Sequence, residues 1–225
     1  MNKKKYKKHW DLSYKRLENN LKYPNEEIIK FLNKFILKEK IKKNKIKFLD
    51  IGCGNGRNVK YILENGYSVV GIDISKIAIN NAKKFLKESK LKNSKYKLIN
   101  ISSDEFKYKL NSFDYIISDS TLDSMPVDEF KKSVKLIYNM IKPDGLVYLN
   151  LINKKNVTHS GKFLNKYDFL IKSKHENKTI QSYFDTKRIN QSFKNFKVIE
   201  KYEIIKLKGK KILDARYHLI LKKKI

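Results

Sequence analysis

The feature that most constrains the fold of this sequence is a run of alternating glycines after a buried strand. The stretch FLDIGCGNGR places Gly52, Gly54 and Gly56 between apolar residues and a segment with helical spacing, in a chain with only eight glycines. A plain tight turn needs one or two glycines, whereas three allow the backbone to come close to a ligand. The sequence therefore predicts a strand–loop–helix unit whose loop binds a ligand at the carboxyl edge of a parallel sheet.

The segments around this loop predict an α/β fold. From Ile46 onward, short apolar strands alternate with amphipathic helices, and two further strands joined around KLKGKK end the chain. Strands separated by helices form right-handed crossovers in a parallel sheet with helices on both faces. The short last connection pairs its strands antiparallel. We expect a Rossmann-like, seven-stranded, mostly parallel sheet with a reversed last strand.

Length and composition fit one domain with a full core. The chain has 225 residues, of which 40% are hydrophobic, and no apolar run reaches the roughly 20 residues that span a bilayer. The basic N-terminal residues are not followed by the apolar segment of a signal peptide. Cys53 is the single cysteine, which excludes a disulfide framework and a multi-cysteine metal site. We expect a soluble, cytoplasmic protein without a resident metal or a membrane partner.

The net charge of +29 permits two interpretations. A basic domain gains affinity for nucleic acid because phosphate contacts release counterions. However, only four of the 52 basic residues are arginines, the residue type suited to bidentate phosphate recognition, and the lysines are scattered along the whole chain. We favour a compositional bias over a selected RNA-binding surface.

Two common phosphate-binding loops do not match the glycine run. In a dinucleotide-binding G-x-G-x-x-G loop the third glycine would fall at position 57, which is Arg57, and no Gly-Lys-Ser/Thr occurs for a P-loop. The pattern that fits is D-x-G-x-G-x-G over residues 50–56, with Asp73 at the end of the next strand. This combination resembles the class I S-adenosylmethionine-dependent methyltransferases over about residues 45–152.

The resemblance implies S-adenosylmethionine as cofactor and a contact for each of its parts. The glycine loop would pack against the amino-acid part, Asp73 would accept both ribose hydroxyls, and Ser102 would face the adenine in preference to Asp104. An alternative role for Asp73 is to cap the helix that begins near Ser75. The residues expected at the cofactor are Trp10, Tyr14, Asp50, Gly52, Cys53, Gly54, Asp73, Ile74, Ser102 and Asp119.

The methyl acceptor is expected beyond the end of the fourth strand. There Asp119 and Asp123 are candidates to orient or deprotonate a substrate, although either is equally consistent with a solvated loop carboxylate. The Asn/Asp-Pro-Pro-aromatic motif of enzymes that methylate amino groups of nucleic-acid bases or glutamine is absent from this position.

The chain divides into two predicted parts. Residues 1–44 resemble the helical lid of small-molecule methyltransferases, with Trp10 and Tyr14 over the cofactor or, alternatively, packed on the sheet. Residues 45–225 form the methyltransferase domain. Within it, the irregular segment 153–184, with His159 and His175, is expected to build the substrate pocket.

These patterns lead to one favoured function and two alternatives. The favoured function is transfer of a methyl group to a small molecule by in-line displacement, in which positioning supplies most of the catalysis. An RNA methyltransferase is the first alternative, supported by charge but by no appended RNA-binding domain. A non-catalytic cofactor-fold module is the second, and it would be expected to have lost the glycines or Asp73.

Overall fold

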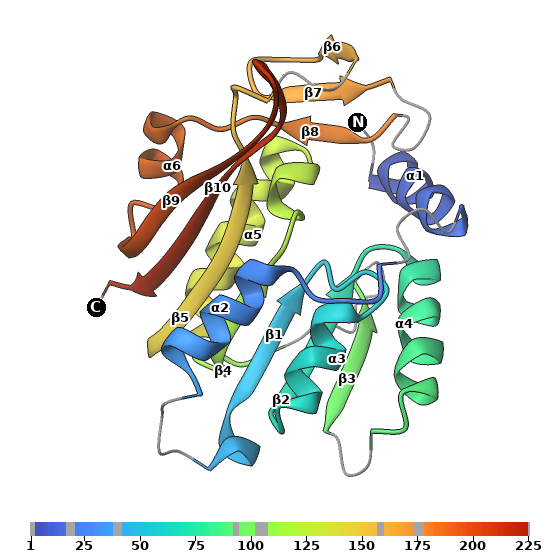
Figure 1. The fold of residues 1–225 in the computed structure, drawn as a ribbon, viewed down its shortest axis with the longest axis vertical. Coiled ribbons are helices and arrows are strands. Elements are labelled where there is room, and N and C mark those ends of the chain that lie inside the picture. The colour runs from blue at the N-terminus through green and yellow to red at the C-terminus, as the bar shows by residue number, and fades with distance from the viewer. Residues whose placement is uncertain are drawn as a thin grey trace.

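The computed structural model describes residues 3–16, 21–37, 42–91, 95–101, 108–156, 160–172 and 178–224. A twisted central sheet carries helices on both faces, and a small second sheet lies beyond the carboxyl ends of its parallel strands (Figure 1). The α/β prediction is therefore confirmed.

The central sheet has seven strands in the order β3-β2-β1-β4-β5-β10-β9. Strands β1 to β5 pair in parallel, whereas β10 pairs antiparallel with both β5 and β9. The reversed last strand is as expected. The strand bounds are β1 (Lys47–Ile51), β2 (Ser68–Asp73), β3 (Tyr96–Asn100), β4 (Phe113–Ser118), β5 (Ile141–Ile152), β9 (Phe196–Lys208) and β10 (Lys211–Lys223).

Helices cover the two faces of this sheet with separate apolar cores. One core combines α2 (Glu26–Phe35), α3 (Arg57–Glu64) and α4 (Lys76–Glu88), and the other combines α5 (Val127–Met140) and α6 (Thr186–Ser192). The caps follow the sequence: the Ser75 hydroxyl accepts from the Ala78 amide at 3.1 Å, and Asp185 accepts from the Arg188 amide at 2.8 Å. The remaining elements of the main body are α1 (Lys3–Lys15), η1 (Lys43–Lys45) and η2 (Leu122–Ser124).

The two N-terminal helices have different positions. Phe31 of α2 is buried against the sheet, with its ring centroid 5.6 Å from that of Tyr148 and 6.2 Å from that of Tyr115. Helix α1 lies beyond the carboxyl ends of the strands (Figure 1). The predicted lid region 1–44 therefore contributes α2 to the core of the main domain, and only α1 occupies a position suited to a lid.

The segment 153–184 contains regular structure that its sequence did not predict. Strands β6 (Gly161–Phe163), β7 (Asp168–Ile171) and β8 (Ile180–Ser182) form an antiparallel sheet in the order β6-β7-β8. The expectation of an irregular segment was wrong because strands of three or four residues are too short to show a periodic pattern. This sheet lies above the carboxyl ends of the central strands (Figure 1).

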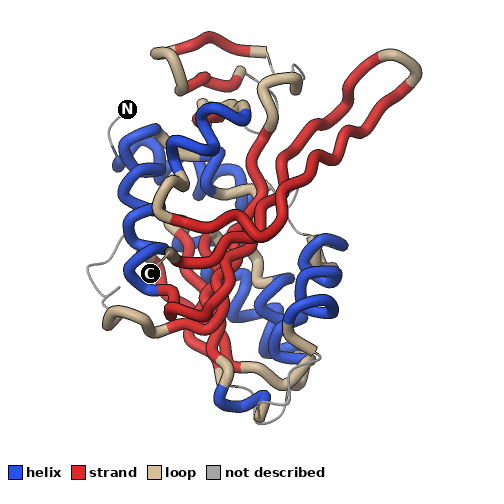
Figure 2. The backbone as a smooth tube through the Cα atoms, turned by 90° about the vertical axis from the view of Figure 1, so that its left-hand side faces the viewer, coloured by secondary structure: helices blue, strands red, loops and turns tan. Residues whose placement is uncertain are grey.

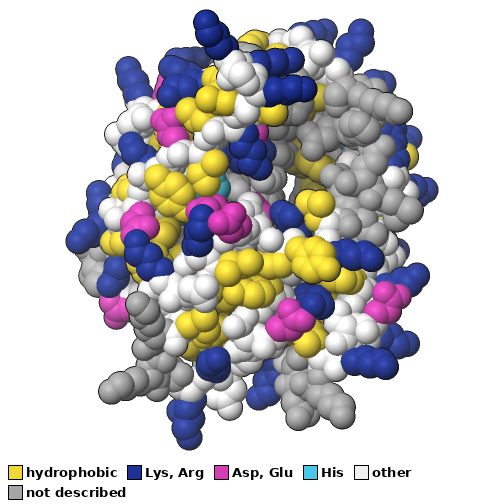
Figure 3. Space-filling model, viewed as in Figure 1, with side chains coloured by type: hydrophobic (Ala, Val, Ile, Leu, Met, Phe, Trp, Pro, Cys, Tyr) yellow, Lys and Arg dark blue, Asp and Glu magenta, His cyan; other side chains and the backbone are white. Residues whose placement is uncertain are grey.

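Basic side chains are spread over the surface. Figure 3 shows lysines and arginines around the whole visible face, interspersed with acidic and apolar side chains, and not gathered into one patch. In the described part of the chain, no helix has the length and apolarity to cross a bilayer.

The packing of α2 gives a first prediction. Replacing Phe31 with Ala should lower the free energy of unfolding by about 3–5 kcal/mol, because it removes a buried aromatic ring and leaves a cavity. Urea unfolding followed by circular dichroism measures this change. The matched control, Tyr23→Ala, removes a ring that is 83% exposed and should change stability by about 0.5 kcal/mol or less. Equal stability of the two variants would show that α2 is not part of the core.

Candidate active site

A large cavity lies at the carboxyl edge of the central sheet, where the strand order reverses between β1 and β4. Its volume is about 1230 Å³, more than one drug-sized ligand needs. Such reversal points are the usual ligand sites of open α/β sheets. The lining comes from the glycine loop, the ends of β2 and β4, α1, α5 and the small sheet, and it includes Trp10, Tyr14, Gly52, Cys53, Gly54, Arg57, Asp73, Ile74, Ile101, Asp119, Thr121, Asp168, Gln181 and Arg216.

The first two loop glycines are required by backbone conformation and by close neighbours. Gly52 and Gly54 have φ values of +73° and +52°, which side-chain-bearing residues rarely adopt. A Cβ at Gly52 would collide with the side chain of Thr121 after β4, and one at Gly54 would lie 2.7 Å from the Tyr14 hydroxyl oxygen. The two glycines therefore allow the loop after β1 to pack closely against Thr121 of the loop after β4 and against Tyr14 of α1.

Asp73 joins the glycine loop to the start of α4. One carboxylate oxygen accepts from the Gly54 amide at 3.0 Å, and the other accepts from the Ser75 amide at 2.8 Å. Burial raises the pKa of Asp73 to about 6, although these two backbone bonds oppose the shift. A carboxylate has about four lone-pair positions, so acceptor capacity remains on the side that lines the cavity.

Asp50 and Cys53 occupy buried positions next to the loop. Asp50 is fully buried and outside the cavity lining, and its carboxylate oxygens have no hydrogen-bond partner among the described residues. Burial raises its pKa well above the usual value, and Asp119 adds to the shift. Cys53 lines the cavity, but burial raises the pKa of its thiol as well. A protonated thiol fits a small apolar filler and not a nucleophile.

Helix α1 presents aromatic rings to the cavity. Tyr6, Trp10 and Tyr14 recur at four-residue spacing, and neighbouring ring centroids lie 6.4 Å apart. The Asp11 carboxylate of α1 accepts from the Ser75 hydroxyl at 2.7 Å, which fixes the helix to the start of α4. Trp10 and Tyr14 therefore line the cavity, and Tyr6 extends the same face by one turn, whereas their contact with a cofactor stays a prediction.

Asp119 is the centre of a polar network at the end of β4. One of its oxygens accepts from Asn25 at 3.1 Å and from Asn150 at 2.7 Å, and the other pairs with Arg57 at 2.6 Å. Three donors saturate much of this carboxylate, which favours an orienting role over proton removal. Sequence reasoning missed its partners, although Arg57 follows the third glycine and could have been expected in the first helical turn.

Asp123 lies away from the cavity and has an ion pair of its own. It is fully buried, it accepts from the Ile152 amide at 2.8 Å, and it pairs with Arg216 at 2.9 Å. Arg216, by contrast, lines the cavity. The arrangement favours a structural role for Asp123, which holds the guanidinium of Arg216 through this ion pair without itself lining the cavity.

The small sheet contributes polar groups that the sequence did not single out. Asp168 of β7 accepts from the Val127 amide at 3.0 Å, which fixes the small sheet to the start of α5. Gln181 of β8 donates to the Asp123 carbonyl at 3.0 Å. Both line the cavity opposite the glycine loop. Of the other predicted site residues, Ile74 lines the cavity, whereas Ser102, His159 and His175 lie outside the described residues.

Comparison with known proteins identifies the family. A family profile described as "Methyltransferase domain" matches residues 42–214, most of the chain. The chain belongs to the methyltransferase-domain family. An S-adenosylmethionine-dependent methyltransferase structure from Methanosarcina mazei has a TM-score of 0.67 at 22% identity, covering 81% of this chain and 94% of that one. This likeness shows the shared fold.

Two curated relatives of this methyltransferase-domain protein are similar in sequence. A ubiquinone biosynthesis O-methyltransferase of Pelagibacter ubique is 34% identical over 151 residues, 64% of this chain and 60% of that protein. An uncharacterized protein of Rickettsia prowazekii is 28% identical over 141 residues, 57% of this chain and 56% of that protein. The chain thus spans less than two thirds of the length of either relative.

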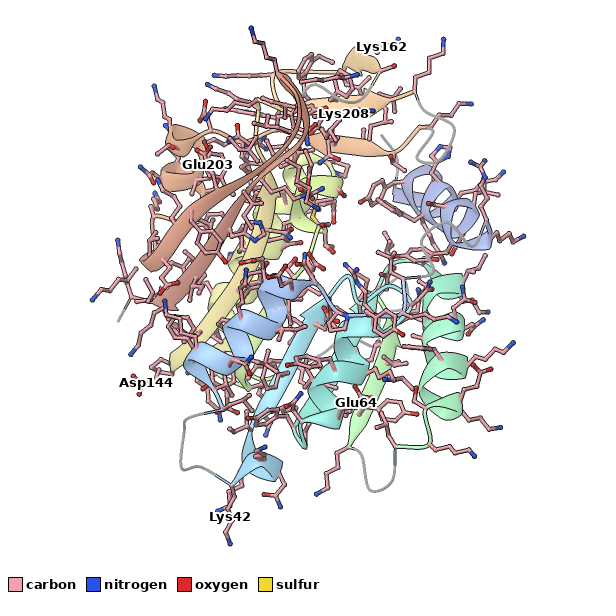
Figure 4. The ribbon with its side chains drawn as sticks, viewed as in Figure 1. Lys42, Glu64, Asp144, Lys162, Glu203 and Lys208 are labelled. Atoms are coloured by element: carbon pink, nitrogen blue, oxygen red, sulfur yellow. The ribbon has the colours of Figure 1, made fainter. Side chains whose placement is uncertain are left out.

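The ion pair of Asp123 gives a second prediction for this methyltransferase-domain protein. Asp123→Ala should lower the free energy of unfolding by about 2–3 kcal/mol, because it leaves the buried Ile152 amide without its acceptor and removes the buried partner of Arg216, which keeps Asp214. Chemical denaturation measures the loss. The control Asp144→Ala breaks a surface ion pair with Lys222, in which Asp144 is 91% exposed and lies at the periphery (Figure 4), and should cost about 1 kcal/mol or less. Unchanged stability of Asp123→Ala together with lost methyl transfer would instead support the catalytic role.

Proposed function

We propose that the protein transfers a methyl group from S-adenosylmethionine to an oxygen atom of a small organic acceptor. The observation that carries this proposal is the juxtaposition of Asp73 and the glycine loop on one wall of the cavity, opposite polar groups of the small sheet. S-adenosylmethionine supplies an activated methyl carbon, so the protein has to bind, orient and desolvate the reactants.

The chain's own residues fit this cofactor. Asp73 retains acceptor capacity toward the cavity, which suits two vicinal ribose hydroxyls. Gly52 and Gly54 present no side chain on the wall that would receive the amino-acid part. The carboxylate of Asp50 is buried outside the cavity lining and has no hydrogen-bond partner among the described residues, so a direct contact of Asp50 with the cofactor is not supported. The other features support the predicted cofactor contacts of Gly52, Gly54 and Asp73.

The other cavity residues have assignable tasks. The rings of Tyr6, Trp10 and Tyr14 would cover the cofactor and exclude water, which strengthens electrostatic interactions inside the cavity. Asp119, held by Arg57, would orient the acceptor at the end of β4.

The proton of an acceptor hydroxyl needs a destination within the same cavity. Asp168 is more suitable than Asp119, because Asp119 is paired with the Arg57 cation. Asp168 lines the cavity, and its donors are neutral: the Val127 amide and the side chains of Asn165 and Ser182. One of these donors would have to give way to the acceptor hydroxyl. General-base catalysis requires such a group within hydrogen-bond reach of the acceptor hydroxyl.

Two observations favour a small acceptor. The small sheet and α1 both contribute to the cavity lining beyond the carboxyl ends of the strands, and the cavity volume of about 1230 Å³ exceeds one drug-sized ligand, which leaves room for a second small molecule. The relative from Pelagibacter ubique is named as an O-methyltransferase of ubiquinone biosynthesis, which supports an oxygen acceptor here. The dispersed basic charge of Figure 3 gives no specific support to an RNA substrate.

A third prediction tests the cofactor. S-adenosylmethionine and S-adenosylhomocysteine should each raise the melting temperature, because a ligand at about 100 times its dissociation constant adds about 2.7 kcal/mol of stability. Differential scanning fluorimetry measures the shift, with NAD as the matched nucleotide control. Stabilisation by NAD alone would reject the proposal.

A fourth prediction concerns pH. The folded-state pKa of Asp73 is raised to about 6 by burial, so the carboxylate takes up a proton as the pH falls through 6. If ribose binding needs the ionised form, the affinity for S-adenosylhomocysteine should fall about tenfold between pH 7 and pH 5. Isothermal titration calorimetry measures this dependence. An Asp73→Asn variant should bind more weakly at pH 7 and show a flat profile, whereas a full pH effect in that variant would exclude Asp73 as its origin.

A further inference from the structure

The hairpin of β9 and β10 extends well beyond the core of the central sheet. Strand β10 pairs with β5 from Arg216 to Lys222, and the Ala215 carbonyl still accepts from the Asn153 amide directly after β5, so residues 211–214 have β9 as their sole strand partner. Figure 2 shows this two-stranded ribbon projecting away from the rest of the protein. An isolated two-stranded ribbon is only marginally stable in water, so its length needs an explanation beyond the fold.

The outer part of this ribbon exposes aliphatic side chains. Leu207 is 60% exposed, Leu213 is 46% exposed, and Ile205 is 39% exposed. Leu207 also pairs across the ribbon with Ile212, which extends the apolar surface to both strands. Several exposed aliphatic side chains on one projecting element are a candidate interaction site.

The same tip carries a concentrated positive charge. Lys206, Lys208, Lys210 and Lys211 are all exposed, and no acidic residue occurs between Glu203 and Asp214. Among the described residues, these four lysines form no ion pair. Figure 4 shows Lys208 on the outer part of the hairpin. Aliphatic side chains and unpaired lysines therefore occupy the same few residues.

We propose that the tip of the β9–β10 hairpin, residues 205–213, docks on an anionic lipid surface. The aliphatic side chains would enter the boundary between headgroups and acyl chains, and the lysines would contact lipid phosphates. Lysine suits this position because its long aliphatic stem lies along apolar surface while its ammonium group stays in the polar layer. The expectation of no membrane partner rested on the lack of a bilayer-spanning apolar run, and docking on a lipid surface needs no such run.

Charge and composition favour lipid over other partners of this surface. Residues 205–213 contain no aromatic side chain for base stacking and no arginine, the features that single-stranded nucleic-acid sites use. A symmetric contact between two copies would bring four lysines of each tip together, which is electrostatically unfavourable. A lipid surface instead supplies phosphates for the lysines and, beneath them, an apolar layer for the aliphatic side chains.

Vesicle co-sedimentation with the full chain tests this proposal. The protein should sediment with vesicles of phosphatidylcholine containing about one third phosphatidylglycerol, and much less with pure phosphatidylcholine. The triple variant Lys208→Ser, Lys210→Ser, Lys211→Ser should bind the anionic vesicles about a hundredfold more weakly, at about fivefold per lysine. The double variant Leu207→Ser, Leu213→Ser should bind them at least tenfold more weakly.

Matched variants on other surfaces provide the controls. Lys83→Ser, Lys84→Ser, Lys87→Ser on α4 removes the same charge, and Leu110→Ser removes an exposed leucine from a turn, and both should bind vesicles nearly as the wild type does. Binding that is equally weakened by the α4 variant would show general charge attraction and overturn the proposal. Tip-dependent dimerisation in light scattering, or tip-dependent binding of RNA without binding of vesicles, would assign the surface to another partner.

Discussion

The carboxylate of Asp73 is the interaction on which the rest of the site depends. It accepts from the amide of Gly54 in the β1 loop and from the amide of Ser75 at the start of α4, so one side chain sets the position of both elements. The hydroxyl of the same Ser75 donates a hydrogen bond to the Asp11 carboxylate of α1. Through these bonds the glycine loop, α4 and the aromatic helix are held around one cavity. Burial of this carboxylate raises its pKa, which is the energetic cost of the arrangement.

The opposite wall of the cavity is supported in the same way by buried polar bonds. Asp168 joins the small sheet to α5, and Asp123 holds Arg216 against the end of β5. Asp73 and Asp168 thus each fix one wall through backbone bonds and also line the cavity. A rigid polar lining of this kind is suited to methyl transfer, in which positioning contributes more than covalent chemistry.

The charge of the protein has two different distributions. On the face shown in Figure 3, lysines are interspersed with acidic and apolar side chains, which agrees with a compositional bias. At the β9–β10 tip, four lysines surround exposed aliphatic residues without intervening acids. The net charge of the sequence does not distinguish dispersed lysines from a lysine cluster, because the difference depends on which lysines lie close together in space.

The sequence by itself determined the sheet, its reversed last strand and the glycine loop. These follow from local signals: apolar strands and helices have different periods, and Gly52 and Gly54 stand where a positive φ is needed. The helix cap at Ser75 could also be predicted, because its side chain bonds to a backbone amide only three residues away.

Tertiary structure alone decided which side chains share the cavity. Arg57 and Asp119 are 62 residues apart, Asp123 and Arg216 are 93 residues apart, and no local pattern pairs them. The small sheet could not be predicted from the sequence either. Its strands of three or four residues are too short to show a periodic pattern, and they are stabilised by pairing with one another. Local propensity fixes backbone conformation within a few residues, whereas burial and ion pairing depend on chain segments that only folding brings together.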